Sequence, residues 1–131
     1  MKISDLAKRS NMNISTIRYY EKQGLIHSTR HQNNYRIYQD EDLATIQFIK
    51  RCKQSGFTLG ETSTLLTIKD NKADHVCQEA KSLTQNKILQ ISSQIETLKS
   101  MLTALTQLEV LCCGGQHNAK FCQIIQSLEM E

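Results

Sequence analysis

The sequence contains no proline and no tryptophan, and only 5% of its residues are aromatic. Without proline, the breaks between helices must come from glycine, asparagine and capping residues. No apolar run approaches the roughly 18 residues that a membrane-spanning helix needs, and the opening MKISDLAKRS lacks the apolar segment of a signal peptide. We therefore expect a cytoplasmic protein with no membrane partner, in which thiols stay reduced.

Cysteine is present in an odd number, since the chain has 5 cysteines among 131 residues. An odd count argues against a pure disulfide framework and leaves metal binding and thiol chemistry open. The length suggests one compact domain, or one small domain with an extension. Apolar residues make up 39%, slightly few for a globular domain, so we expect an apolar stripe to be buried against a partner subunit.

Charge is unevenly distributed along the chain. Residues 1–54 hold ten Lys/Arg and five Asp/Glu, a net charge of +5, whereas residues 55–131 hold six and eight, a net charge of −2. A basic front half predicts a head that binds a polyanion, although a solvated surface of uneven charge would give the same pattern.

Two short helical patterns open the chain. DLAKRS follows Ser4, a candidate N-cap, and ISTIRYYEKQ follows Asn13, a second candidate cap, with Gly24 as its stop. The intervening NMN is typical of a turn, so the pair predicts a helix-turn-helix. After it, polar HQNN precedes the β-leaning YRIY, and Asn33 and Asn34 tolerate positive φ, which predicts a small β wing.

Two further helices are predicted from their ends. The stretch QDEDLATIQFIKRCKQSG has acidic residues at its start, as the helix dipole favours, and Gly56 at its end. Thr58 and Glu61 form a capping-box pattern for a helix that ends near Ile68.

A long polar helix is predicted from Val76 to Glu109. Its apolar residues step by three and four and form a heptad seam: Ile88, Ile91, Ile95, Leu98, Leu102 and Leu105. The seam predicts dimerisation, the alternative being packing on the chain's own N-terminal domain. The predicted fold is mainly α, with a winged helix-turn-helix DNA-binding domain at 1–70, a dimerisation helix at 71–109, and a metal-binding loop with a short helix at 110–131.

The second helix of the helix-turn-helix is the candidate recognition helix. Residues at the start of such a helix reach base edges in the major groove, while basic and hydroxyl side chains around it hold phosphates. For Tyr20, packing in the protein core is as good an explanation as contact with a phosphate. For Arg18, the alternative to a DNA contact is a salt bridge on the protein surface. The candidate DNA contacts, from this helix and the wing, are Ser15, Thr16, Arg18, Tyr19, Tyr20, Arg36 and Tyr38.

Three strings, STIRYYEKQGLI, YRIYQDEDL and FIKRCKQSGFTLGE, together resemble the N-terminal domain of the MerR family of bacterial regulators. The resemblance covers residues 2–68, although Asn34 stands where the family's wing carries glycine. It implies a homodimer with a winged helix-turn-helix head, a long antiparallel coiled-coil helix and a short effector loop. It also implies promoter DNA and RNA polymerase as partners, with activation by bending and untwisting of the bound DNA.

The stretch VLCCGGQHNAKFC holds Cys112, Cys113, His117 and Cys122, with the spacing C-C-x3-H-x4-C. Zinc sites usually present C-x2-C or C-x4-C pairs, with two or four residues between the cysteines, and the side chains of adjacent cysteines tend to diverge. The adjacent pair is therefore expected to split between two ions, Cys112 with Cys122 and Cys113 with His117. Two ligands are too few for a divalent ion, which takes about four.

Cys77 is the candidate for the missing ligand. It lies 35 residues before Cys112, which a straight helix converts to a separation of roughly 50 Å. It therefore cannot reach the loop of its own chain unless the helix breaks, but in an antiparallel dimer it meets the loop of the other chain. His75 nearby is either a solvated residue at a helix start or a ligand or supporting residue, and as a ligand it would favour nickel or cobalt.

The loop and Cys77 together resemble the zinc-responsive (ZntR-like) branch of the MerR family. This resemblance implies that Cys112, Cys113, His117 and Cys122 are metal ligands and that Cys77 comes from the other subunit. Zinc is the expected divalent ion, with nickel, cobalt and cadmium as alternatives. The sequence thus predicts a metal-responsive transcription activator. A nickel- or cobalt-responsive regulator of metal uptake or efflux and a thiol redox sensor are the alternatives.

No enzyme is expected, because a Cys113–His117 pair would lack an evident pocket, a third member and a cofactor motif. Cys52, in FIKRCKQSG, is expected to be a buried structural thiol. His27 and His31 are expected near the wing, at the surface or beside a phosphate.

Overall fold

The structure is a computed structural model that describes residues 1–30 and 36–130. The chain packs as two compact units, Met1–Thr84 and Gln85–Glu131. Among the described residues, no helix has the length and apolar character needed to cross a membrane.

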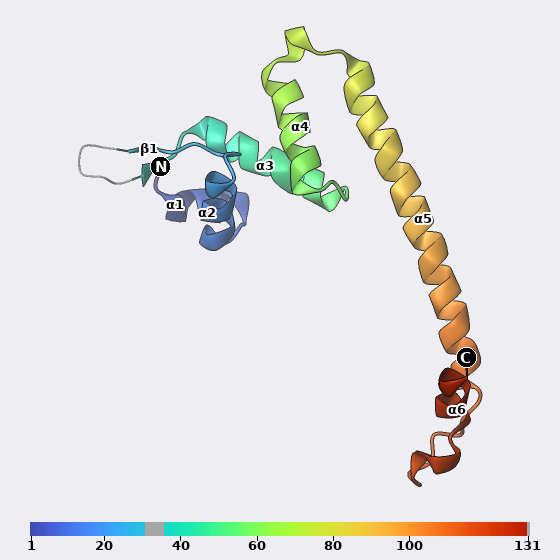
Figure 1. The fold of residues 1–131 in the computed structure, drawn as a ribbon. Coiled ribbons are helices and arrows are strands. Elements are labelled where there is room, and N and C mark those ends of the chain that lie inside the picture. Colours follow the sequence, from blue (N-terminus) through green and yellow to red (C-terminus); the bar gives the residue numbers. More distant parts are fainter. Residues whose placement is uncertain (31–35, 131) are drawn as a thin grey trace. The chain divides into compact units, whose positions relative to one another are not determined.

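The helix-turn-helix consists of α1 (Ile3–Ser10) and α2 (Ile14–Lys22) (Figure 1). Asn11 makes the turn between them in the left-handed conformation, with φ 53°, which asparagine tolerates better than most residues. Gly24 follows α2 with φ 81°, as expected of a helix stop. The prediction that Ser4 caps this helix is wrong. The helix α1 already begins at Ile3, whose side chain is partly buried against the core.

The wing is an antiparallel ribbon of two short strands, β1 (Thr29–Arg30) and β2 (Arg36–Ile37). The predicted turn lies outside the described residues, together with His31, Asn33 and Asn34. Directly after β2, the backbone amide of Tyr38 donates to the carbonyl of Met1 over 2.8 Å. The wing is therefore tied by its second strand to the start of the chain.

Two more helices, α3 (Asp40–Gln54) and α4 (Leu59–Asp70), complete the head. The predicted capping box opens α4: the Glu61 amide donates to Thr58 Oγ1 over 3.1 Å, and the Thr58 amide donates to Glu61 Oε1 over 2.8 Å. Two amides that a helix start leaves unpaired are thereby satisfied. The helix continues past Ile68 to Asp70, and a short 3-10 turn, η1 (Lys72–Asp74), follows.

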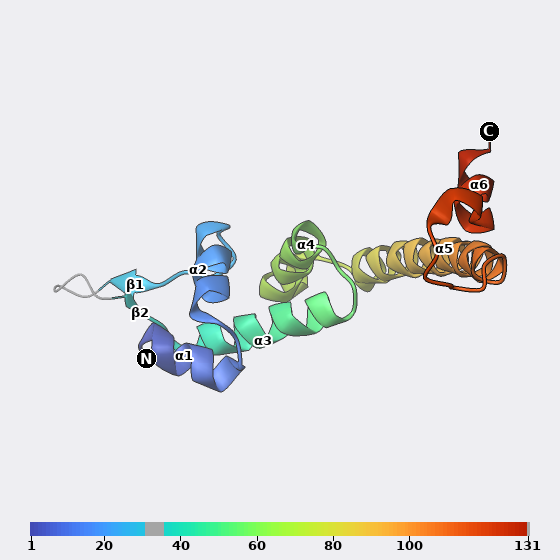
Figure 2. The ribbon, with the colours of Figure 1, turned by 90° about the horizontal axis from the view of Figure 1, so that it is seen from below.

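The core of the first unit fixes the recognition helix α2 on its scaffold. Figure 2 shows α1 beside α3, and α1 contacts both α2 and α3. The head is therefore held together by apolar packing between its helices rather than by the short wing. The buried side chains of this core are Leu6, Ile17, Tyr20, Ile26, Tyr38, Ile46, Ile49 and Leu66.

The helix α5 (Cys77–Glu109) is uninterrupted over 33 residues. Its heptad seam is uncovered in the single chain, with exposed fractions of 46% at Ile95, 63% at Leu98 and 66% at Leu102. Such a seam is apolar surface that a partner helix buries in a coiled coil. After α5 come residues 110–122, which we call the cysteine loop, with the 3-10 turn η2 (Ala119–Phe121), and then α6 (Gln123–Glu129).

Candidate DNA interface and metal loop

The recognition helix offers polar side chains at its start. Ser15 and Arg18 are exposed, Thr16 is half-buried, and Tyr19 has half of its surface exposed. The first turn of α2 contains no acidic residue, so no carboxylate there would repel a phosphate. This end of the helix is therefore suited to contact with DNA.

A hollow of about 390 Å³ adds a residue that the sequence did not single out. In it, Lys53 at the end of α3 lies with hydroxyl side chains of α2, and ammonium and hydroxyl groups are the donors that hold phosphate oxygens. The only local signal is that Lys53 is a basic residue in the last turn of α3. The hollow is lined by Ser15, Thr16, Tyr19, Tyr20, Lys53 and Leu59.

The structure corrects the expectation for Tyr38. This residue is 1% exposed and belongs to the core, so it has no surface to offer a phosphate. Its hydroxyl donates to Glu21 Oε2 over 2.8 Å, and burial, reinforced by the Glu21 carboxylate, raises the pKa of that hydroxyl. Arg36 stays exposed, with its Nη1 3.2 Å from the same Glu21 oxygen. Tyr20 is also largely buried, although it lines the hollow.

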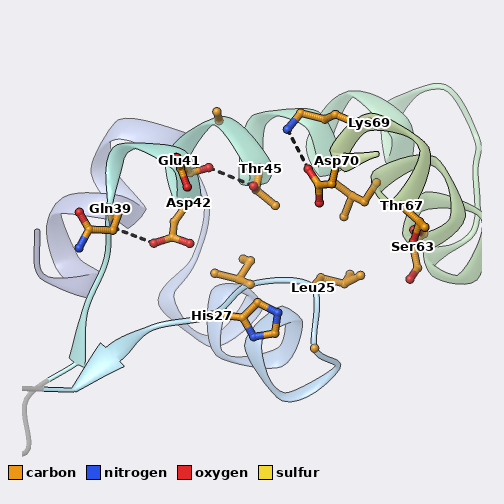
Figure 3. A pocket seen from close by; sticks show the side chains of 14 residues that line it. Leu25, His27, Gln39, Glu41, Asp42, Thr45, Ser63, Thr67, Lys69 and Asp70 are labelled. Atoms are coloured by element: carbon orange, nitrogen blue, oxygen red, sulfur yellow. Dashed lines mark hydrogen bonds and ion pairs between the residues drawn. The ribbon is translucent and has the colours of Figure 1, made fainter. Parts of the chain in front are cut away.

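A larger cavity of about 640 Å³ lies in the same unit, between α3, α4 and the segment after α2 (Figure 3). His27, Asp42 and Asp70 line it from these three segments, and Lys69 pairs with Asp70 over 3.6 Å. None of the predicted metal ligands is among its lining residues. It offers carboxylates and an imidazole but no thiol, and so differs in chemistry from the cysteine loop.

In the cysteine loop, the Cys112 thiol lies close enough to Cys122 to contribute to the lowering of the Cys122 pKa. Cys122 is the N-cap residue of α6, so its thiol lies near the backbone amides of the first turn of that helix. The Ile125 amide has the largest effect and lowers the pKa of the Cys122 thiol, because it stabilises the thiolate. Desolvation opposes it, and the Ile124 amide and the Cys112 thiol lower the pKa further. The Gly114 amide donates to Cys112 Sγ over 3.5 Å. The two sulfurs thus lie together among donors.

Cys113 and His117, the second predicted pair, both have side-chain atoms near Gly115. A Cβ placed on Gly115 would lie 2.6 Å from Cε1 and Nδ1 of the His117 ring and 3.7 Å from Cys113 Sγ. The imidazole and the sulfur therefore border one small gap that a glycine leaves open. The assignment of the two pairs as metal ligands stays a prediction, and Gly115 lies near both members of the second pair.

Cys77 and His75 lie at the start of α5. His75 Nδ1 is 2.9 Å from Glu79 Oε2, which also accepts a hydrogen bond from the Val76 amide at 3.1 Å. A carboxylate on one ring nitrogen orients the imidazole and leaves the other nitrogen for a second partner. Cys77 is an exposed thiol. Within the described part of the chain, no three His, Cys, Asp or Glu side chains are placed to hold one ion.

Cys52 differs from the other cysteines. All five thiols are free, but Cys52 is buried beside Thr62 in the head. Burial raises the pKa of its thiol, against a smaller opposing effect of a hydrogen bond with Thr62. A buried thiol of raised pKa is a poor ligand and a poor nucleophile.

Comparison with known proteins gives this arrangement a family. A family model described as MerR HTH family regulatory protein matches residues 1–68, and one described as MerR, DNA binding, matches residues 43–108. The HTH-type transcriptional regulator ZntR of Escherichia coli (strain K12) is 36% identical over 129 residues, which cover 98% of this chain and 92% of that protein.

Two solved structures extend the likeness over the whole chain. The transcription regulator PbrR691 from Ralstonia metallidurans CH34, in complex with lead(II), matches with a TM-score of 0.87 and 29% identity over 98% of each chain. The dual-function transcriptional regulator MerR from Bacillus megaterium MB1, in complex with mercury(II), matches with a TM-score of 0.68 and 33% identity, over 99% of this chain and 100% of that one.

Proposed function

The chain belongs to the MerR family of helix-turn-helix regulators, and on this premise we propose that it is a zinc-responsive activator that binds promoter DNA as a homodimer in the cytoplasm. It is a metal-responsive transcription regulator of that family and not an enzyme. RNA polymerase is its second macromolecular partner. The metal-loaded dimer bends and untwists the bound DNA and so turns the promoter on.

The observation that carries this proposal is the pairing of ligands in the cysteine loop. The Cys112 thiol lies close enough to Cys122 to lower its pKa, and Cys113 and His117 both have side-chain atoms near Gly115. Thiolate sulfur and imidazole nitrogen are the ligands that tetrahedral zinc prefers. Each pair supplies two of the roughly four ligands that a zinc ion takes, and the Cys77 thiolate of a second chain would supply a third ligand to both.

The exposed seam of α5 supports the dimer. Covering one exposed Leu or Ile side chain contributes about 1.5–3 kcal/mol, so the seams of two helices supply enough for a stable association. In an antiparallel pair, the start of one α5 lies beside the end of the other. Cys77 would then meet the partner's cysteine loop, which makes the metal site part of the subunit interface.

The test of the metal titrates Zn, Ni, Co, Cd and Cu(I) separately against transcription from the bound promoter with purified RNA polymerase, and counts the metal per dimer. Zinc is expected to activate at the lowest free concentration. Activation by nickel or cobalt at a lower free concentration than zinc would mean that the protein senses one of those metals, as expected if His75 is a ligand. A promoter that responds to none of these metals would refute metal regulation.

The sharing of ligands between subunits has its own test. A heterodimer is made from one chain carrying Cys77→Ser and another carrying Cys112→Ser with Cys113→Ser. If Cys77 acts across the dimer, this heterodimer keeps one complete site, whereas either variant homodimer keeps none. Loss of metal binding in the heterodimer would show that Cys77 does not complete the partner's loop. Cys52→Ala is the matched thiol control and keeps the wild-type metal content.

A thiol redox switch is the second candidate function. The contact between the Cys112 and Cys122 thiols, with the lowered pKa of Cys122, favours it, because low-pKa thiols oxidise more readily. Peroxide and a chelator are applied separately to the transcription assay. A response abolished by the chelator and unchanged by peroxide supports the metal switch, and the reverse supports the redox switch.

A further inference from the structure

Glu21, in the last turns of α2, joins the recognition helix to the wing. Its side chain is only 16% exposed. Its Oε2 accepts a hydrogen bond from the Tyr38 hydroxyl over 2.8 Å and lies 3.2 Å from Nη1 of Arg36, while its Oε1 accepts one from the Ser28 hydroxyl. The three donors come from the segment after α2 and from the wing, so one carboxylate holds together two parts of the proposed DNA interface.

The geometry fixes the carboxylate before DNA arrives. Tyr38 is buried in the core, so its hydroxyl gives Glu21 Oε2 a stationary donor. Arg36 contacts that same oxygen through one nitrogen, whereas a guanidinium carries five N–H donors in a rigid plane. The Arg36 side chain remains 41% exposed. An arginine held in this way loses less conformational freedom when it contacts a phosphate.

We propose that Glu21 is a positioning residue that orders Arg36 for contact with the DNA backbone. The proposal rests on the DNA binding proposed above, and it concerns the wing rather than the metal site. It opposes a simpler picture, in which Glu21 competes with phosphate for Arg36. The two models predict opposite changes in DNA affinity when the Glu21 charge is removed. Binding becomes weaker if Glu21 orders Arg36, and tighter if Glu21 competes with phosphate for it.

The test is a double-mutant cycle on DNA affinity. The probe is the duplex that the wild-type protein selects from a random-sequence pool, bound at several salt concentrations. Arg36→Ala is expected to reduce the salt slope by about 1.8, the loss of one phosphate contact from each subunit of the dimer. Glu21→Gln is expected to weaken binding about tenfold in the wild-type background and less than about twofold in the Arg36→Ala background, a coupling typical of residues in contact.

Each other outcome overturns the inference. Equal losses in both backgrounds would mean that Glu21 only stabilises the head, and tighter binding of Glu21→Gln would mean competition. An Arg36→Ala variant with unchanged affinity and salt slope would remove Arg36 from the interface. If the wild-type protein selects no duplex, the proposed function fails, whereas binding without coupling removes only the role of Glu21.

One further variant keeps the test independent of folding. Glu21→Gln retains an oxygen acceptor for the Tyr38 hydroxyl, and thermal melting checks that the head folds. If it does not fold, Tyr38→Phe takes its place, because it removes the donor that holds Glu21 Oε2 and is expected to weaken binding about threefold, again only when Arg36 is present.

Discussion

Adding one methyl group at Gly115 is expected to weaken zinc binding by Cys113 and His117 in the cysteine loop. In Gly115→Ala, the new Cβ would lie 2.6 Å from Nδ1 and Cε1 of His117, whereas ordinary contacts begin at 3.4 Å, so the ring must move by about 0.8 Å. The substitution causes no backbone strain, because Gly115 is not among the glycines with positive φ.

The size of the effect follows from the tolerance of metal coordination. Ligand distances in a metal site hold within about 0.2 Å, so a shift of about 0.8 Å takes the imidazole out of position unless the loop rearranges. Disturbing the support of one ligand typically weakens metal affinity about 10- to 100-fold, or about 1.4–2.8 kcal/mol. We therefore expect zinc affinity at the Cys113–His117 pair to fall by that factor, with the Cys112–Cys122 pair less affected.

The assay is a competition for zinc between the reduced, metal-free protein and a chelating indicator. Gly114→Asn is the matched control, because Gly114 has a φ of 76°, which asparagine tolerates, and a Cβ there meets nothing within 4 Å. Its affinity is expected to stay within about threefold of wild type. Wild-type affinity in Gly115→Ala, together with weak binding in His117→Ala, would refute the placement of the ring. Wild-type affinity in both variants would remove His117 from the ligand set.

Three other outcomes are expected. Lys53→Ala should weaken DNA binding about equally for all sequences and lower the salt slope by about 2, since the dimer loses one lysine from each subunit. Titration at several salt concentrations measures both effects, and a change in sequence preference would instead indicate a base contact. When the metal-free protein is treated with a thiol reagent, the four cysteines that are exposed or half-buried should react at once. Cys52 should react only when the protein unfolds, so early labelling of Cys52 would contradict its burial. Burial raises the pKa values of Tyr38 and Tyr20 in the folded state, so above a pH of about 10 the unfolded chain loses these protons before the folded one does. The free energy of unfolding in urea should therefore fall as pH rises from there, and less steeply in Tyr38→Phe.

Features set by neighbours in the sequence could be predicted from the sequence. The capping box joins Thr58 to Glu61 within one helical turn, and both of its hydrogen bonds are present. The extent of α5 follows from an unbroken helical pattern and ends at Glu109, as predicted. The predicted start of α1 is wrong. Ser4 has a local preference for the cap position, but the packing of Ile3 against the core extends the helix to Ile3.

Features made by residues far apart in the chain could not be predicted. Glu21 accepts a hydrogen bond from the hydroxyl of Tyr38, which lies 17 positions further along the chain. Nothing in the sequence around either residue predicts this contact. The same hydroxyl made Tyr38 look suited to phosphate, and only its burial shows otherwise. In the cysteine loop, the spacing suggested the two ligand pairs, whereas the role of Gly115 depends on where the His117 ring turns.

The adjacency of Cys112 and Cys113 has a consequence for the shape of the response. Their sulfurs belong to different pairs, yet a single peptide unit joins them. Ordering either pair immobilises that unit and so lowers the entropy cost of ordering the other, which is positive cooperativity. A loop built in this way fills over a narrow range of free metal rather than gradually. Under the proposed function, the covalent link between these two neighbouring residues would give the promoter a threshold.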